Sequence, residues 1–132
     1  MDATPGGNWP QPISAITLFV DDLAAAKEFY GRAFGLPVMY EDDASTVFNF
    51  GNTIINLLKA TEAVELVAPA AVASQSAGSR MQLTIGVDNV DAMCAELQSR
   101  GVELLNGPMD RPWGIRTAAF ADPAGHVWEI AK

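Results

Sequence analysis

Apolar and polar positions along the chain predict short strands and two helices. The β-branched run ISAITLFV over residues 13–20 predicts a strand. Asp22 then offers an N-cap, and LAAAKEFYGRAF over residues 23–34 has the apolar spacing of a helix that ends before Gly35. Three short strands are predicted to follow, over residues 37–41, 45–50 and 53–59.

The second half of the chain repeats this order. A helix is predicted over residues 90–100, a loop over residues 106–113, and strands over residues 81–87, 102–105, 114–121 and 126–131. The sequence VDDL that begins at Val20 corresponds to VDNV at Val87, and IINL at Ile54 corresponds to VWEI at Val127. The sequence therefore predicts an internal duplication.

The duplication predicts one α+β domain built from two tandem βαβββ modules. The first module covers about residues 13–59 and the second about residues 80–131. The connector over residues 60–79 is rich in Ala, Ser and Glu, and its middle is expected to form a short helix or a strand. The whole chain of residues 1–132 is therefore expected to form a single domain.

Composition and charge narrow the classes of function. The chain has 132 residues, 49% of them hydrophobic, with 8 Lys and Arg against 16 Asp and Glu and a net charge of -8. This charge argues against a nucleic-acid partner and against an anionic membrane surface. Cys94 is the only cysteine, so an internal disulfide is excluded. The sequence has neither signal-peptide features nor an apolar run long enough to span a bilayer, so a cytoplasmic location is expected.

The quoted motifs point to a known family. The runs ITLFVDDLAAAKEFYGRAFGLPV, INLL, LTIGVDNVDAMCAEL and FADPAGHVWEI resemble the vicinal oxygen chelate superfamily, and the likeness covers residues 13–131. That superfamily includes glyoxalase I, extradiol dioxygenases, fosfomycin-resistance transferases and bleomycin-resistance proteins. The resemblance implies two curved mixed sheets around a cleft. It also implies a homodimer whose cavities are often shared between chains.

The resemblance also implies where a metal would bind. The metal enzymes of the superfamily use one position early in the first strand of each module and one in the last strand. In this chain these positions fall on Ala15, Asn56, Gln82 and Glu129. Only Glu129 is ionisable, whereas a catalytic divalent site normally has three good protein ligands. We therefore expect no metal and no other cofactor. A divalent metal completed by Gln82 is the alternative. The single histidine, His126, is expected at the strand mouth or on the surface, and it cannot supply the two histidines of an iron dioxygenase.

The expected ligand-binding residues combine aromatic and polar side chains: Phe19, Phe48, Phe50, Asn56, Gln82, Trp113 and Glu129. Glu129 is interpreted as an inward carboxylate that holds a ligand or acts as a catalytic base; alternatively, it bonds to Gln82 or Asn56 in a filled pocket. Each phenylalanine is either a cavity wall or ordinary sheet core. Trp113, in the sequence RPWG, either stacks on a planar or cationic ligand or fixes its own loop.

Three functional hypotheses follow. The first is a bleomycin-resistance-like, metal-free protein that sequesters a planar or cationic antibiotic-like molecule. The second is an enzyme of the same fold, a glyoxalase-like lyase, an isomerase or a dioxygenase, which uses a metal or the carboxylate of Glu129. The third is an interaction module whose cavity is filled by its own side chains. The missing metal ligands and the acidic charge favour the first hypothesis.

Overall fold

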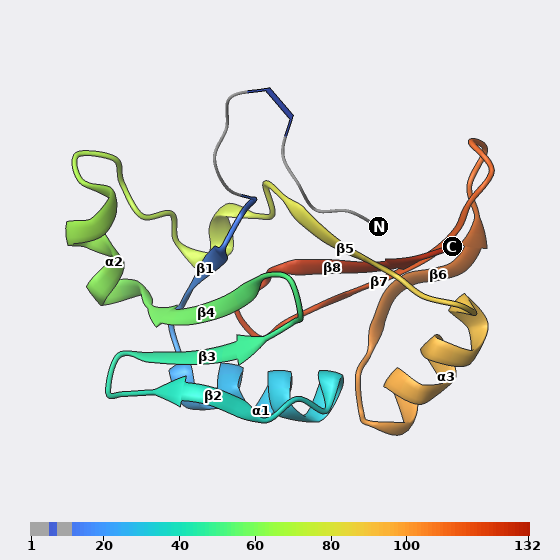
Figure 1. Ribbon diagram of the computed structural model, residues 1–132, viewed down its shortest axis with the longest axis horizontal. Helices are drawn as coiled ribbons and strands as arrows, with labels where there is room; N and C mark the ends of the chain where they lie inside the picture. The colour runs from blue at the N-terminus through green and yellow to red at the C-terminus, as the bar shows by residue number, and fades with distance from the viewer. Residues whose placement is uncertain (1–5, 8–11) are drawn as a thin grey trace.

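The computed structural model describes residues 6–7 and 12–132 and has two βαβββ units in tandem (Figure 1). The elements of the first unit are β1 (Ala15–Val20), α1 (Leu23–Phe34), β2 (Val38–Glu41), β3 (Ser45–Asn49) and β4 (Ile54–Lys59). The connector forms α2 (Ala60–Val67) and the 3-10 turn η1 (Gln75–Ala77). The elements of the second unit are β5 (Gln82–Gly86), α3 (Val90–Ser99), β6 (Leu104–Asp110), β7 (Arg116–Ala121) and β8 (Val127–Ala131).

Each unit forms one four-stranded mixed sheet with the same topology. The strand orders are β1-β4-β3-β2 and β5-β8-β7-β6, and the first and last strands of each unit pair in parallel. In equivalent registers, Thr17 lies opposite Asn56 and Thr84 lies opposite Glu129. The predicted α+β class and the internal duplication are therefore confirmed.

The helices begin and end where the sequence indicates. Asp22 accepts a hydrogen bond from the Ala25 N–H at 3.0 Å and so caps α1. Asn89 caps α3 in the same way through the Ala92 N–H, at 2.9 Å. Gly35 ends α1 with a φ of 66°, a left-handed conformation that glycine adopts without steric cost.

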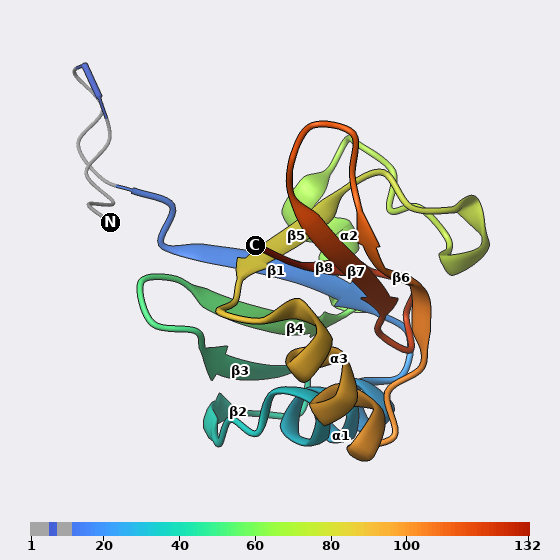
Figure 2. The same cartoon turned by 90° about the vertical axis from the view of Figure 1, so that its right-hand side faces the viewer.

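A single core joins the two units. It lies between the helix-facing sides of both sheets and includes α1 and α3, which lie close together in Figure 2. Tyr30 and Phe120 are completely buried there, and Phe34 packs between Phe120 and Trp128. The side of each sheet that faces this core is called here its inner face, and the opposite side its outer face.

Two arginines connect the ends of the helices across the duplication. Arg32 of α1 donates to the backbone carbonyl of Arg100, at the end of α3, at 2.7 Å. Arg100 in turn donates to the carbonyl of Ala33, in the last turn of α1, at 2.8 Å. Each guanidinium thus satisfies a carbonyl that the other helix leaves without an intrahelical partner.

The sequence prediction is wrong for the strand that follows α3. Residues 106–113 were expected to form a loop, yet β6 continues through Asp110. The pairing with β7 is irregular around Gly107 and Pro108, which is how a sheet accommodates a proline inside a strand. A Cβ atom on Gly107 would lie 2.5 Å from the Thr117 carbonyl oxygen, so only glycine fits so close to β7.

Candidate functional site

The outer face of each sheet carries one hydrogen-bonded polar pair. On the first outer face the Asn56 side-chain amide donates to the Thr17 hydroxyl at 3.4 Å. On the second outer face the Thr84 hydroxyl donates to Oε1 of Glu129 at 3.0 Å. The two pairs occupy equivalent positions of the duplication, so the fold itself places a polar centre on each outer face.

The two polar pairs differ in the interaction that is missing, which is a hydrogen bond in the first and an ion pair in the second. The Asn56 Oδ1 atom is buried and has no hydrogen-bond partner among the described residues. Buried polar atoms in proteins are rarely left unpaired, so we expect this oxygen to accept a hydrogen bond from a donor outside the described residues. Glu129 is half-buried and forms no ion pair with a described residue.

The threonines of these pairs were missed by the sequence analysis. The ligand positions implied by the resemblance were Ala15 and Gln82, but these residues lie opposite Ile54 and Val127 in the neighbouring strands. Gln82 is exposed on the same outer face as Glu129. It pairs with Val127, two residues before Glu129 in β8. In each first strand a threonine stands two positions after the implied ligand position, and side chains two positions apart on a strand lie on the same face. This spacing was the signal in the sequence that could have indicated the threonines.

These donor atoms do not fit a divalent metal site. The four positions Ala15, Asn56, Gln82 and Glu129 supply one carboxylate, two neutral amides and one methyl group, and the neighbouring threonines add only neutral hydroxyl groups. No group of three or more His, Cys, Asp or Glu side chains gathers into a metal-binding cluster within residues 6–7 and 12–132.

The predicted aromatic residues are not brought together. Of the two alternatives expected for Phe48, a cavity wall or ordinary sheet core, the structure shows the second, because the residue is 1% exposed on the inner face and its ring stacks on Tyr30. Phe50 lines a pocket of about 290 Å³ between β1 and β5, where its ring stacks on Trp128. Phe19 is half-buried on the first outer face. Trp113 is 68% exposed in the turn between β6 and β7.

The histidine lies at a strand end and joins a hydrogen-bond network that leads into the core. His126 was expected at the strand mouth or the surface; it immediately precedes β8, its side chain is 22% exposed, and its Nδ1 lies 2.9 Å from Oδ2 of Asp122. Oδ2 also accepts from the Tyr30 hydroxyl at 2.7 Å, and that hydroxyl accepts from the Trp128 indole N–H at 3.0 Å. The other oxygen, Oδ1, accepts backbone N–H bonds from Ala124 and His126.

The network favours an ionised carboxylate. Burial by itself raises the pKa of Asp122, but the hydrogen bonds from His126 and Tyr30 outweigh it and hold this pKa below its usual value. Burial, together with the neighbouring Asp122 charge, raises the pKa of Tyr30, so its hydroxyl stays protonated and donates. Because an ionised carboxylate only accepts, the proton between it and the imidazole belongs to Nδ1 of His126.

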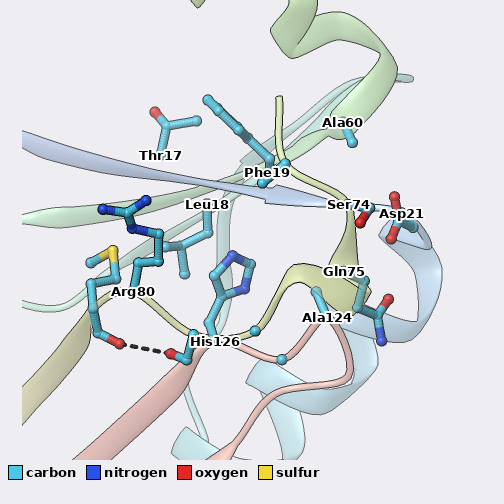
Figure 3. A pocket seen from close by; sticks show the side chains of 15 residues that line it. Thr17, Leu18, Phe19, Asp21, Ala60, Ser74, Gln75, Arg80, Ala124 and His126 are labelled. Atoms are coloured by element: carbon cyan, nitrogen blue, oxygen red, sulfur yellow. Dashed lines mark hydrogen bonds between the residues drawn. The ribbon is translucent and has the colours of Figure 1, made fainter. Parts of the chain in front are cut away.

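His126 also lines a pocket of about 260 Å³ (Figure 3). We call it the connector pocket, because its walls come from β1, the connector and the turn between β7 and β8; the residues that define it here are Phe19, Asp21, Gln75, Arg80, Met81 and His126. In Figure 3 the Arg80 guanidinium and the Asp21 carboxylate lie on opposite sides of the imidazole. Within the part of the chain that the structure describes, Arg80 forms no ion pair.

A family model and a curated relative each match most of the chain. A model of the Glyoxalase/Bleomycin resistance protein/Dioxygenase superfamily matches residues 13–130. The uncharacterized protein YraH of Bacillus subtilis (strain 168) is 33% identical over 121 residues, which cover 89% of this chain and 94% of that protein.

Solved structures show the same fold. A glyoxalase/bleomycin resistance protein/dioxygenase from Nocardioides is similar with a TM-score of 0.84 at 25% identity, over 95% of this chain and 85% of that one. A glyoxalase-related enzyme from Fulvimarina pelagi is similar with a TM-score of 0.79 at 28% identity, over 92% of this chain and 88% of that one. In the described residues of this chain, every helix is too short or too polar to cross a membrane.

Proposed function

Because the chain belongs to the glyoxalase/bleomycin resistance protein/dioxygenase superfamily, we propose that it binds a small planar or cationic organic molecule and sequesters it without a metal, as an antibiotic-resistance protein does. The observation that carries this proposal is the Glu129 carboxylate. It is half-buried on the second outer face, is oriented by Thr84, and forms no ion pair with a described residue. A cationic ligand would compensate the cost of partly burying this charge.

The first outer face supplies a complementary polar group. Its Asn56 Oδ1 atom has no partner among the described residues, and it would accept a hydrogen bond from a ligand once the side chain turns to expose this buried atom. Phe19 lies half-buried on the same face, where its ring would contact a planar ligand. Trp113 and Gln82, both exposed, would contribute at the rim.

A second copy of the chain would complete the proposed cleft. The inner faces pack together in the shared core, where a pocket of about 290 Å³ remains beside Phe50, and the outer faces carry the Asn56 and Glu129 pairs that a second copy would enclose. Several large apolar side chains are exposed and would be covered in a homodimer: Met39, Tyr40, Met81, Leu105 and Trp113. We expect a dimer in sedimentation equilibrium, and we expect Trp113→Ala to weaken both dimerisation and ligand binding.

The binding proposal is tested with a thermal-shift screen. Ethidium serves as a planar cation, fluorescein as a planar anion, and Zn²⁺ and Mn²⁺ as metals. A ligand present at 100 times its Kd stabilises the folded protein by about 2.7 kcal/mol, which raises Tm by several degrees. We expect ethidium to raise Tm and the other probes to leave it unchanged.

A matched pair of variants tests whether the Glu129 carboxylate binds the cation. Glu129→Gln removes the carboxylate with little change of shape, and Glu103→Gln removes the same charge from an exposed position of the second unit. We expect ethidium binding to be lost in the first variant and kept in the second. Equal loss in both would mean that only the net charge matters, and a metal-induced shift would overturn the metal-free proposal.

One observation favours a second candidate function, a lyase or isomerase that uses Glu129 as its base. Thr84 donates to Oε1 and leaves Oε2 available, which is how a carboxylate base is held in orientation. If this candidate is correct, turnover of a glyoxalase substrate is abolished by Glu129→Gln and needs no added metal. Turnover that is unchanged in this variant would exclude Glu129 as the base.

A further inference from the structure

We propose that the connector pocket is a separate binding site for a small hydroxycarboxylate, which His126 contacts through Nε2 and Arg80 holds by its carboxylate. The proposal does not rest on the cleft function, because Asn56 and Glu129 do not line this pocket. Thr17 and Phe19 border both places, but the groups that would recognise each ligand, Asn56 and Glu129 in the cleft and Arg80 and His126 in the pocket, are different.

The pocket is held together by contacts between distant segments. The Gln75 side-chain amide donates to the Pro123 carbonyl at 3.0 Å, which ties the connector to the turn between β7 and β8. Gly125, in that turn, lies against Gln75, since a Cβ atom there would be 4.0 Å from the Gln75 side chain. The pocket is therefore bounded on two sides by segments that hold each other in place.

The contact with Asp122 fixes the orientation of the His126 imidazole. Its Nδ1 is engaged by Asp122, whose two oxygens accept four hydrogen bonds within 3.0 Å. Since Nδ1 carries the shared proton, the neutral ring presents a lone pair at Nε2. Nε2 has no hydrogen-bond partner among the described residues, and the ring lines the pocket while Asp122 does not. A ligand with a hydroxyl group would donate to Nε2.

The other walls define the rest of the ligand. The Arg80 guanidinium suits a carboxylate, which it would bind with two parallel hydrogen bonds. Phe19 and Met81 offer apolar surface to a short alkyl chain, and the Asp21 carboxylate disfavours a second negative charge. A volume of about 260 Å³ lies below the roughly 300–1,000 Å³ of pockets that hold drug-sized ligands. These features together select a small monocarboxylate that carries a hydroxyl group.

Because the chain has a single histidine, nuclear magnetic resonance of the imidazole ring reports on this site alone. We expect the free protein to show the tautomer with the proton on Nδ1 at a pH where the ring is neutral. The probes are 2-hydroxybutyrate and butyrate, which differ by the hydroxyl group. We expect 2-hydroxybutyrate to shift the ring resonances and butyrate to bind roughly 3- to 10-fold more weakly, the loss expected for one hydrogen bond.

Two variants separate specific binding from a general charge effect. Arg80→Gln lies on the pocket wall, and Lys132→Gln removes the same charge from an exposed position outside the pocket lining. We expect the first to abolish the shift and the second to keep it, with both folds verified by circular dichroism. The proposal is wrong if the proton resides on Nε2 in the free protein, if both acids bind equally or not at all, or if both variants behave alike. Loss of ethidium binding in Glu129→Gln, with this shift intact, would show that the two sites are independent.

Discussion

Replacing Tyr30 with phenylalanine tests the buried network directly. The hydroxyl of Tyr30 donates to Asp122 at 2.7 Å and accepts from the Trp128 indole at 3.0 Å, and the residue is completely buried. Phenylalanine keeps the ring and its stacking on Phe34 but removes both hydrogen bonds. Water cannot easily replace them, because the surrounding core is close-packed.

The expected loss in the free energy of unfolding follows from the two lost hydrogen bonds. A hydrogen bond to a charged group contributes about 1.5–3 kcal/mol, and the orphaned indole N–H of Trp128 adds a cost of about 1 kcal/mol. We therefore expect Tyr30→Phe to lower the free energy of unfolding by about 2–4 kcal/mol at pH 7. With an m-value of about 2 kcal/mol/M, the urea midpoint falls by about 1–2 M.

The chain offers a matched control in Tyr40→Phe. The Tyr40 hydroxyl also donates to an aspartate, Asp42, at 2.9 Å, but Tyr40 is 55% exposed. Water replaces that bond, so we expect a change within about 0.5 kcal/mol. Both variants are unfolded in urea at one protein concentration and followed by circular dichroism. Equal costs in the two variants would refute the argument that burial makes the Tyr30 network important.

The pH dependence gives a second signature of the same network. The Tyr30 bond helps to lower the pKa of Asp122, so it contributes most when this carboxylate is ionised. We expect the cost of Tyr30→Phe to shrink in the acid range below about pH 4, as the pH falls through the folded-state pKa of Asp122, which lies below the usual aspartate value. A cost that stays constant through the acid range in which the folded protein takes up this proton would contradict an ionised Asp122.

Four further predictions concern packing and acid stability. Gly107→Ala would place a Cβ atom 2.5 Å from the Thr117 carbonyl, and we expect a loss of at least about 1–3 kcal/mol in urea unfolding. Gly31→Ala, inside α1 with open space around the position, should instead gain about 0.5–1 kcal/mol. Phe120→Ala removes a completely buried ring and should cost about 3–5 kcal/mol; a cost under 1 kcal/mol would mean that the core rearranges. In the unmodified protein, the pKa of Asp122 is lowered in the folded state, so its contribution to the free energy of unfolding is complete above about pH 4. This contribution is lost as the pH falls through the folded-state pKa. An acid titration of the urea midpoint measures the loss.

Local signals explain why most of the fold could be predicted. Asp22, Asn89 and Gly35 define helix ends through short-range hydrogen bonds and backbone conformation, which depend on a few neighbouring residues. The extended β6 was missed, because the bulge that accommodates Pro108 depends on β7, a partner that the local pattern does not reveal.

The candidate site was predicted less completely, because it depends on pairing between distant strands. The resemblance indicated Glu129 and Asn56 as site positions, but their hydrogen-bond partners Thr84 and Thr17 depend on the parallel register. The role of His126 depends on Tyr30, which is 92 residues away from Asp122 in the sequence. No local pattern could have connected these residues.

The reciprocal arginine contacts have a consequence for the history of the chain. Arg32 satisfies the end of α3 and Arg100 satisfies the end of α1, so each half now supplies a part that the other half lacks. A gene fragment that encodes one half would produce a helix with an uncapped end and a sheet with an uncovered apolar side. After fusion, a substitution at either arginine would affect both halves, so the ancestral repeat can no longer be divided without loss.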